Sequence, residues 1–372
     1  MRGNASSRRT SQRNATIGTA KWLRWRLVLA ALALGCNEAS TPSPPNTVPK
    51  GRRVLSLDVN QAETQNYDAA FGAAYRAGIR SVSLALDWGT IETTAGRFDF
   101  SNVDIANIYY PAAGVQVGLS VRPVSTTYRT VPADLAARTL DDPVMIQRFN
   151  ALLDSLHTRL PAVALSGLYL GSEHDVFFGV DSVAWGQWAV FYAATRTHAK
   201  SLWPAVPIGT EFTYEGLTGP AARYAARSNT SSDVIAVSYY PLEGGFQVRS
   251  PGEVTHGFDT IAAAYPGRPI HYNQVGYPSS DVNGSSDEMQ RQFVVALFAA
   301  WDAHADQVTL VNINWLTDLS QAAVDAFQDL YDLHNPQFAE FLRSLGLRRY
   351  PGSGVDKPAW TELVKQAAMR GW

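Results

Sequence analysis

The chain has 372 residues, of which 46% are hydrophobic and 17% charged, so it can bury a core as large as a single large domain needs. Its formal net charge is −2, but the first 35 residues hold seven basic side chains and no acidic one, and the remainder carries a net charge of −9. A body this acidic has no basic stripe for nucleic acid, which excludes nucleic acid as a partner.

The first 36 residues have the pattern of an export signal. A basic start is followed by the apolar run 27–35 and then by Cys36. At about nine residues this run is too short to span a bilayer, which takes ~20. The segment resembles a bacterial lipoprotein signal, in which such a cysteine becomes the lipidated first residue, although Ala33 stands where leucine is usual. Export without lipidation is the alternative.

Residues 37–51 are rich in proline, serine and threonine, a composition that favours extended, hydrated backbone. We expect them to tether the folded body, 52–372, away from a membrane. The protein is therefore expected to be an exported bacterial protein, anchored at the cell envelope through lipid on Cys36 or otherwise secreted. Because Cys36 is the only cysteine, no disulfide within the chain stabilises the body.

From residue 54 onward, apolar runs alternate with segments of helical periodicity. The predicted strands are 54–59, 82–86, 115–121, 165–170, 206–210, 234–241, 269–275 and 308–315. Helices are predicted after the N-cap residues Asn66 and Ser286, after Asp181-Ser182, and across 143–159. Several strands are apolar on both faces, which indicates a closed parallel barrel, a single-domain α/β fold of the (β/α)8 TIM-barrel type. An open doubly wound sheet is disfavoured because no glycine-rich phosphate loop follows the first strand.

Active sites of such barrels lie at the carboxyl ends of the strands. The residues expected there are Asp58, Asp87, Trp88, Arg122, Glu173, His174, Asp175, Glu211, Tyr240, Gln274, Trp315 and Asp318. They suit neutral polyhydroxylated ligands, because carboxylates and amides hydrogen-bond to hydroxyls and flat rings cover sugar C–H faces. The lysines lie off the strands and no histidine pair has metal-binding spacing on one strand, so no Schiff base, metal or other cofactor is expected.

Several short motifs occur in order at the predicted strand ends. Residues 88–100 are Trp-Gly-Thr-Ile-Glu-Thr-Thr-Ala-Gly-Arg-Phe-Asp-Phe, 171–173 are Gly-Ser-Glu, 238–241 are Ser-Tyr-Tyr-Pro, and 274–280 are Gln-Val-Gly-Tyr-Pro-Ser-Ser. With Trp315 and a C-terminal Lys357-Pro-Ala-Trp, they resemble the (β/α)8 glycoside hydrolases that carry an acid/base after strand four and a nucleophile after strand seven, such as endo-β-galactanases and β-glucanases. The resemblance covers 53–372.

The resemblance implies a role for each matching residue and an oligo- or polysaccharide as partner. Glu173 takes the place of the acid/base, and Trp315 that of the tryptophan beneath the first sugar. Ser172 replaces the asparagine that contacts the sugar 2-hydroxyl, and Tyr240 resembles the tyrosine that touches the nucleophile. Further substrate contacts are expected from Asp87, Trp88, Arg122 and Tyr277.

The nucleophile position holds Gln274 where these enzymes have glutamate. An amide is a very poor nucleophile, so it cannot perform the double displacement of a retaining enzyme, which needs two carboxyl groups. Three hypotheses remain. The protein is a hydrolase or transglycosylase that uses another acid, namely Glu211, Asp175 or Asp318; it is a glycan-binding pseudoenzyme; or it is an envelope scaffold with a vestigial cleft.

Several of these residues also have a structural alternative. The alternatives are a salt bridge for Glu173, packing for Trp88 and Trp315, an ion pair of Arg122 with Asp58 or Asp87, and buried hydrogen bonds for His174 and His271.

Lipidation at Cys36 predicts that metabolic labelling with a fatty acid will mark the wild-type protein and not Cys36→Ser, because the variant lacks the thiol that carries the lipid. The wild type should fractionate with membranes and the variant should not. Equal labelling of the two proteins, or a wild type found wholly in the soluble fraction, would contradict the anchor.

Overall fold

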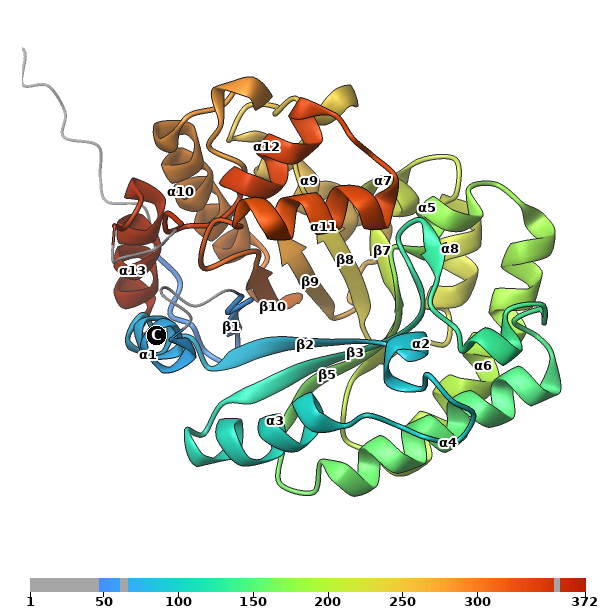
Figure 1. The fold of residues 1–372 in the computed structure, drawn as a ribbon. Helices are drawn as coiled ribbons and strands as arrows, with labels where there is room; N and C mark the ends of the chain where they lie inside the picture. The colour runs from blue at the N-terminus through green and yellow to red at the C-terminus, as the bar shows by residue number, and fades with distance from the viewer. Residues whose placement is uncertain (1–46, 61–65, 351–354) are drawn as a thin grey trace, which may run out of the picture. The chain divides into compact units, whose positions relative to one another are not determined.

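The computed structural model of the chain describes residues 47–60, 66–350 and 355–372 (Figure 1). The predicted export signal, Cys36 and the tether up to residue 46 lie outside this part of the chain. Of the helices described, none has both the length and the apolar character needed to cross a membrane.

A ring of parallel strands forms the centre of the fold, in the order β6-β5-β3-β2-β1-β10-β9-β8-β7. The strands are β1 (Val54–Leu57), β2 (Ser81–Asp87), β3 (Gln116–Ser125), β5 (Leu165–Ser172), β6 (Ile208–Gly209), β7 (Glu211–Thr213), β8 (Ile235–Tyr239), β9 (Ile270–Val275) and β10 (Val308–Ile313). β6 pairs with β5 and β7 pairs with β8, and only Thr210 separates them, so the two segments form one interrupted strand that closes the ring. β4 (Tyr128–Arg129) is a short antiparallel partner of β3. The eight predicted strands and the barrel are thereby confirmed.

Helices cover the outside of the barrel (Figure 1). They are α1 (Tyr67–Arg76), α2 (Trp88–Ile91), α3 (Ser101–Ala112), α4 (Pro143–Arg159), α5 (His174–Phe178), α6 (Ser182–Leu202), α7 (Tyr214–Thr218), α8 (Ala222–Asn229), α9 (Glu253–Ala264), α10 (Asp287–Ala303), α11 (Gln321–Tyr331), α12 (Pro336–Ser344) and α13 (Pro358–Arg370), with 3-10 turns at Ala133–Leu135, Gly244–Phe246 and Asp281–Asn283. The predicted caps are confirmed, because Asn66 and Ser286 accept hydrogen bonds from the first turns of α1 and α10. Asp181 caps α6 in the same way.

Aromatic side chains pack the layer between strands and helices. Phe149 of α4 packs edge-on against Trp88 and against Phe191 of α6, with ring centroids 5.1 and 5.0 Å apart. α11 and α12 instead pack on a smaller cluster that includes Tyr240 and Trp315, which follow β8 and β10. These two helices therefore form a wall at the carboxyl end of the barrel.

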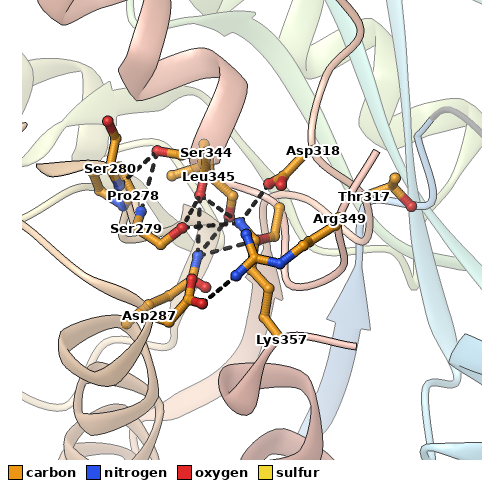
Figure 2. Close-up of polar contacts among 12 residues, drawn as sticks. Pro278, Ser279, Ser280, Asp287, Thr317, Asp318, Ser344, Leu345, Arg349 and Lys357 are labelled. Atoms are coloured by element: carbon orange, nitrogen blue, oxygen red, sulfur yellow. Dashed lines mark hydrogen bonds and ion pairs between the residues drawn. The ribbon is translucent and has the colours of Figure 1, made fainter. Parts of the chain in front are cut away.

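A buried lysine joins the loops that follow β9 and β10 (Figure 2). Lys357 Nζ donates to Asp318 Oδ1 at 2.6 Å, to Ser279 Oγ at 3.1 Å, and to the carbonyl oxygens of Ser344 and Gly346 at 2.9 and 2.7 Å. Burial lowers the pKa of Lys357, and the surrounding acceptors compensate the ammonium for lost water. The lysine thus fixes the segment that carries Trp315 into the mouth of the barrel.

Replacing Lys357 with methionine should lower the free energy of unfolding by about 3–5 kcal/mol, because Asp318 and two carbonyl groups would lose their buried donor. Urea denaturation followed by tryptophan fluorescence measures this. Lys365→Met is the matched control, on the helix that Lys357 precedes, since its ammonium is exposed and meets Glu362 at 3.4 Å. The control should change stability by less than about 0.5 kcal/mol, and equal effects of the two variants would show that the Lys357 cluster contributes nothing.

Candidate active site

A cavity of about 350 Å³ opens at the carboxyl ends of the strands, where the sequence predicts the site. The predicted residues that line it are Asp58, Asp87, Arg122, Ser172, Glu173, Glu211, Gln274 and Trp315. A second cavity of about 390 Å³ adjoins Glu173 and is also lined by Glu215, Tyr240 and Arg249. Glu173 is the carboxyl group that borders both.

Two hydroxyl groups hold the carboxylate of Glu173. Thr126 Oγ1 donates to Glu173 Oε2 at 2.8 Å, and Ser238 Oγ donates to Glu173 Oε1. The residue has left-handed backbone (φ 49°), and its N–H donates to the carbonyl oxygen of Glu211 at 2.9 Å. Within the described part of the chain Glu173 has no ion pair, so the salt-bridge alternative does not apply.

Glu211 is a second carboxyl group in the same cavity, at the start of β7, and only 2% of its surface is exposed. Ser172 Oγ donates to its Oε2 at 2.9 Å, and Gln274 Nε2 donates to its Oε1 at 3.1 Å. Burial, together with the charge of Glu173, raises the pKa of Glu211 to about 8. The raised pKa favours the protonated form of Glu211 at neutral pH.

The amide of Gln274 is held from both ends. Its Oε1 accepts from Tyr240 Oη at 3.0 Å and from Asn314 Nδ2 at 3.3 Å, while its Nε2 donates to Glu211. Tyr240 thus makes the contact that the resemblance implied. The donors fix which end of the amide faces Glu211, so Gln274 acts on Glu211 as a hydrogen-bond donor.

Aromatic and charged side chains complete the walls of the cavity. The indole of Trp315 hydrogen-bonds to Asp58, whose pKa burial raises to about 6, and its ring stacks near Phe327 of α11 at 6.0 Å between centroids. Arg122 Nε lies 2.7 Å from Asp87 Oδ1, so the predicted ion pair of Arg122 is confirmed with Asp87 as its partner. Both charges are thereby neutralised, and the cavity suits an uncharged ligand.

No known family profile matches the chain, and no curated protein matches it. Solved structures do. The exo-β-1,4-mannosidase Op5Man5 from Opitutaceae bacterium strain TAV5 superposes with a TM-score of 0.66 at 16% identity, over 86% of this chain and 59% of the mannosidase, so the chain spans about three fifths of that protein. A GH5_18 protein from Streptomyces cattleya in complex with GlcNAc gives 0.63 at 17% identity over 87% and 80% of the two chains. The GH53 catalytic domain of Ignisphaera aggregans gives 0.60 at 15% identity over 88% and 99%.

The chain has the (β/α)8-barrel fold that these glycoside hydrolases share. Identities this low establish the architecture, and the chemistry has to be argued from the cleft itself.

Two predicted substrate contacts lie outside the cleft of this glycoside hydrolase fold. Trp88 is fully buried, with its indole N–H donating to Glu92 Oε2 at 2.7 Å, so the structure gives it the packing alternative. Tyr277 is 1% exposed and donates to the carbonyl oxygen of Arg249 at 2.6 Å. Because both rings are buried, neither can contact a sugar. The prediction failed because a position at a strand end does not determine which way the side chain points.

Two of the three acids considered as a replacement nucleophile or base are also engaged elsewhere. Asp175 accepts from Thr213 N and Thr213 Oγ1 at 3.0 and 2.6 Å, and Asp318 is the partner of Lys357. Neither lines the 350 Å³ cavity, which leaves Glu211 as the only one of the three in the cleft.

The buried His174 and His271 differ in their hydrogen bonding. His271 Nδ1 lies 2.8 Å from Tyr169 Oη, which confirms a buried hydrogen bond. His174 packs between Trp188 and Phe212, and neither ring nitrogen has a hydrogen-bond partner among the described residues, so the prediction is wrong for His174. Burial lowers the pKa of each to about 3, so both are neutral.

Ser238, Asn314, Thr126 and Tyr331 are among the residues of the site that the sequence analysis missed. Ser238 and Asn314 lie on or beside predicted strands, and a polar residue close to Tyr240 or Trp315 at a strand end could have been predicted to face the site. Thr126 lies in the loop after β3, and Tyr331 lies on α11, where it meets Tyr128 at 6.0 Å between centroids. Nothing in the local sequence marks either. Elsewhere in the described chain, no cluster of three His, Cys, Asp or Glu side chains is arranged to hold a metal ion.

The raised pKa of Glu211 predicts a pH-dependent stability. Because the folded state holds this proton up to about pH 8 while an unfolded glutamate releases it near 4.5, stability falls as pH rises between these values. Glu211→Gln should flatten that fall, by on the order of 1 kcal/mol per pH unit, because its amide can donate to Ser172 Oγ and accept from Gln274 without titrating. Denaturation at pH 5 and pH 8 compares the proteins, and an unchanged pH slope in the variant would contradict the buried proton.

Proposed function

We propose that the protein is a carbohydrate-active enzyme that hydrolyses glycosidic bonds of an oligo- or polysaccharide with Glu173 and Glu211. The observation that carries the proposal is that both carboxyl groups line one cavity and that burial and the charge of Glu173 keep Glu211 protonated. Glycoside hydrolysis needs one carboxyl group to protonate the leaving oxygen and one to take a proton from water or to attack. A cavity in which the raised pKa of Glu211 favours its protonated form beside the charge of Glu173 meets this need.

Because the pKa of Glu211 is raised, Glu211 is assigned as the general acid that protonates the leaving oxygen. Glu173, which borders both cavities, is assigned as the general base that takes a proton from the attacking water. Gln274 is a positioning residue, since its amide donates to Glu211 and has no carboxylate oxygen with which to attack a sugar. An inverting course, in which water attacks the sugar directly, fits this assignment because it needs no carboxylate at position 274.

A non-catalytic sugar-binding protein is the second candidate. The fully hydrogen-bonded, uncharged Gln274 amide favours it, because the cleft is complete without the carboxylate that retaining enzymes use. Trp315 and the neutralised Arg122–Asp87 pair would serve binding equally well in both cases.

The change Gln274→Glu separates the two candidates. If Glu173 and Glu211 form the working pair, the new carboxyl group removes the donor to Glu211 and adds a repelling charge, so hydrolysis of aryl glycosides should fall about 10²-fold. Glu173→Gln and Glu211→Gln should each lower the rate of hydrolysis by at least the same factor. Activity of the wild type should also decline above about pH 8, where Glu211 loses its proton.

A binding protein gives the opposite pattern. Its wild type would not hydrolyse any glycoside but would bind oligosaccharides on a glycan array, about tenfold more weakly after Trp315→Ala. Tyr350→Ala, which changes an exposed aromatic ring outside the cleft, is the matched control. In that case Gln274→Glu would create retaining activity. Wild-type activity that survives Glu173→Gln would remove Glu173 from the mechanism.

We further propose that the enzyme is exported and lipid-anchored through Cys36. The last residues of the expected tether support an outward-facing cleft, since Lys50 N donates to the carbonyl oxygen of Arg370 at 2.9 Å and Arg53 Nη2 donates to that of Val48 at 2.6 Å. These contacts hold the start of the body beside the amino end of β1, away from the strand ends that bear the cleft.

A further inference from the structure

The cavity continues below the carboxyl groups into the barrel, where serine and asparagine side chains stand among the apolar Val82, Ala85 and Leu310. Two residues before Asp58, Arg122 and Asn314 on the same strands stand Ser56, Ser120 and Asn312, and alternate strand residues face the same side. Asn273 and Gly118 also line this lower part. Barrel interiors are usually filled by valine, isoleucine and leucine, so an open polar shaft is a specific feature of this chain.

Three buried polar atoms of the shaft have no hydrogen-bond partner among the residues that the structure describes: Ser120 Oγ, Asn273 Oδ1 and Asn312 Oδ1. Their residues are 8%, 8% and 3% exposed. The amide nitrogen of Asn312 donates to Asn273 O at 2.8 Å and to Asn314 Oδ1 at 3.2 Å, which orients its free oxygen. Because an unpaired buried acceptor is costly, the shaft is suited to a group that donates hydrogen bonds.

The surroundings narrow the chemistry of that group. Serine, asparagine and glycine carry no charge, so the lower shaft neither repels nor pairs an ion, and a neutral donor is favoured over an amine or an anion. Its lining is also narrow, since a Cβ on Gly118 would meet Ser166 Oγ at 3.5 Å and the Tyr169 ring at 3.6 Å. A single primary alcohol on a short carbon arm meets both conditions.

We infer that the shaft binds the hydroxymethyl group of a hexopyranose whose ring occupies the cleft. The inference rests on the proposed carbohydrate-directed function and deepens it by naming the substrate class: hexosides are accepted and the pentosides that lack this group are discriminated against.

Matched sugar pairs test the inference. Glucose and xylose, galactose and L-arabinose, and mannose and lyxose differ, as pyranosides, only by the hydroxymethyl group. Titration calorimetry of the wild-type protein with their methyl pyranosides should show tighter binding of the hexoside by about tenfold in the pair whose configuration the cleft accepts.

Ser120→Val should abolish that preference, because it removes a hydroxyl that bonds no protein group and fills the shaft with a methyl group. Gly118→Ala is the second variant, since its Cβ would make only ordinary contacts and should fold if Ser120→Val does not. Thr195→Val is the control: this buried hydroxyl on α6 bonds only to its own helix, and the preference should survive.

Equal binding of hexosides and pentosides by the wild type, or an unchanged preference in both shaft variants, overturns the inference while the proposed function stands. If no sugar binds, the proposed function fails, and crystals soaked in glycerol decide the shaft on its own. A glycerol hydroxyl within hydrogen-bond distance of Asn273 Oδ1 or Asn312 Oδ1 supports the alcohol pocket, and water alone at these atoms contradicts it.

Discussion

The hydrogen bond from Gln274 Nε2 to Glu211 Oε1 is the contact on which the rest of the cleft depends. An amide can accept at one end and donate at the other, and Gln274 does both, taking hydrogen bonds from Tyr240 and Asn314 and giving one to Glu211. An ionised carboxylate at position 274 could only accept, and it would face a second carboxyl group across about the same distance. An amide at position 274, where the resemblance implies glutamate, therefore determines what this position can hold, as well as what it can attack.

A second departure from the glycosidase pattern acts on the same group. Ser172 stands where asparagine is usual, and its hydroxyl donates to the other oxygen of Glu211. The backbone also joins the two residues, because the N–H of Glu173 donates to the carbonyl oxygen of Glu211. The left-handed conformation of Glu173 begins the turn into α5. Glu211 is thus linked to Glu173 by a backbone hydrogen bond, and the charge of Glu173 contributes to the raised pKa of Glu211.

The sequence predicts the barrel well because its strands are buried on both faces and appear as continuous apolar runs, and because the helices begin at Asn66, Asp181 and Ser286, whose caps act locally. It also predicts Glu173, Glu211, Gln274 and Trp315 in the cleft, since strand ends converge in a barrel. The sequence does not predict the direction or the partner of a side chain where these depend on tertiary packing. Trp88 turns toward α4, Asp318 pairs with Lys357 39 residues further on, and Tyr331 reaches the cleft only because α11 and α12 pack beside Trp315.

A polar shaft in a barrel interior carries a cost that has to be offset elsewhere. Each inward serine or asparagine gives up the apolar contact that a branched side chain would make, and unpaired atoms such as Ser120 Oγ add a desolvation cost. The outer layer compensates with a dense aromatic cluster in which His174, kept neutral by burial, packs on Trp188 at 4.2 Å. Stability in this chain thus lies mainly between strands and helices, which leaves the interior free to be hollow. That division favours a functional origin for the shaft, because natural proteins retain a locally destabilising feature where a ligand uses it.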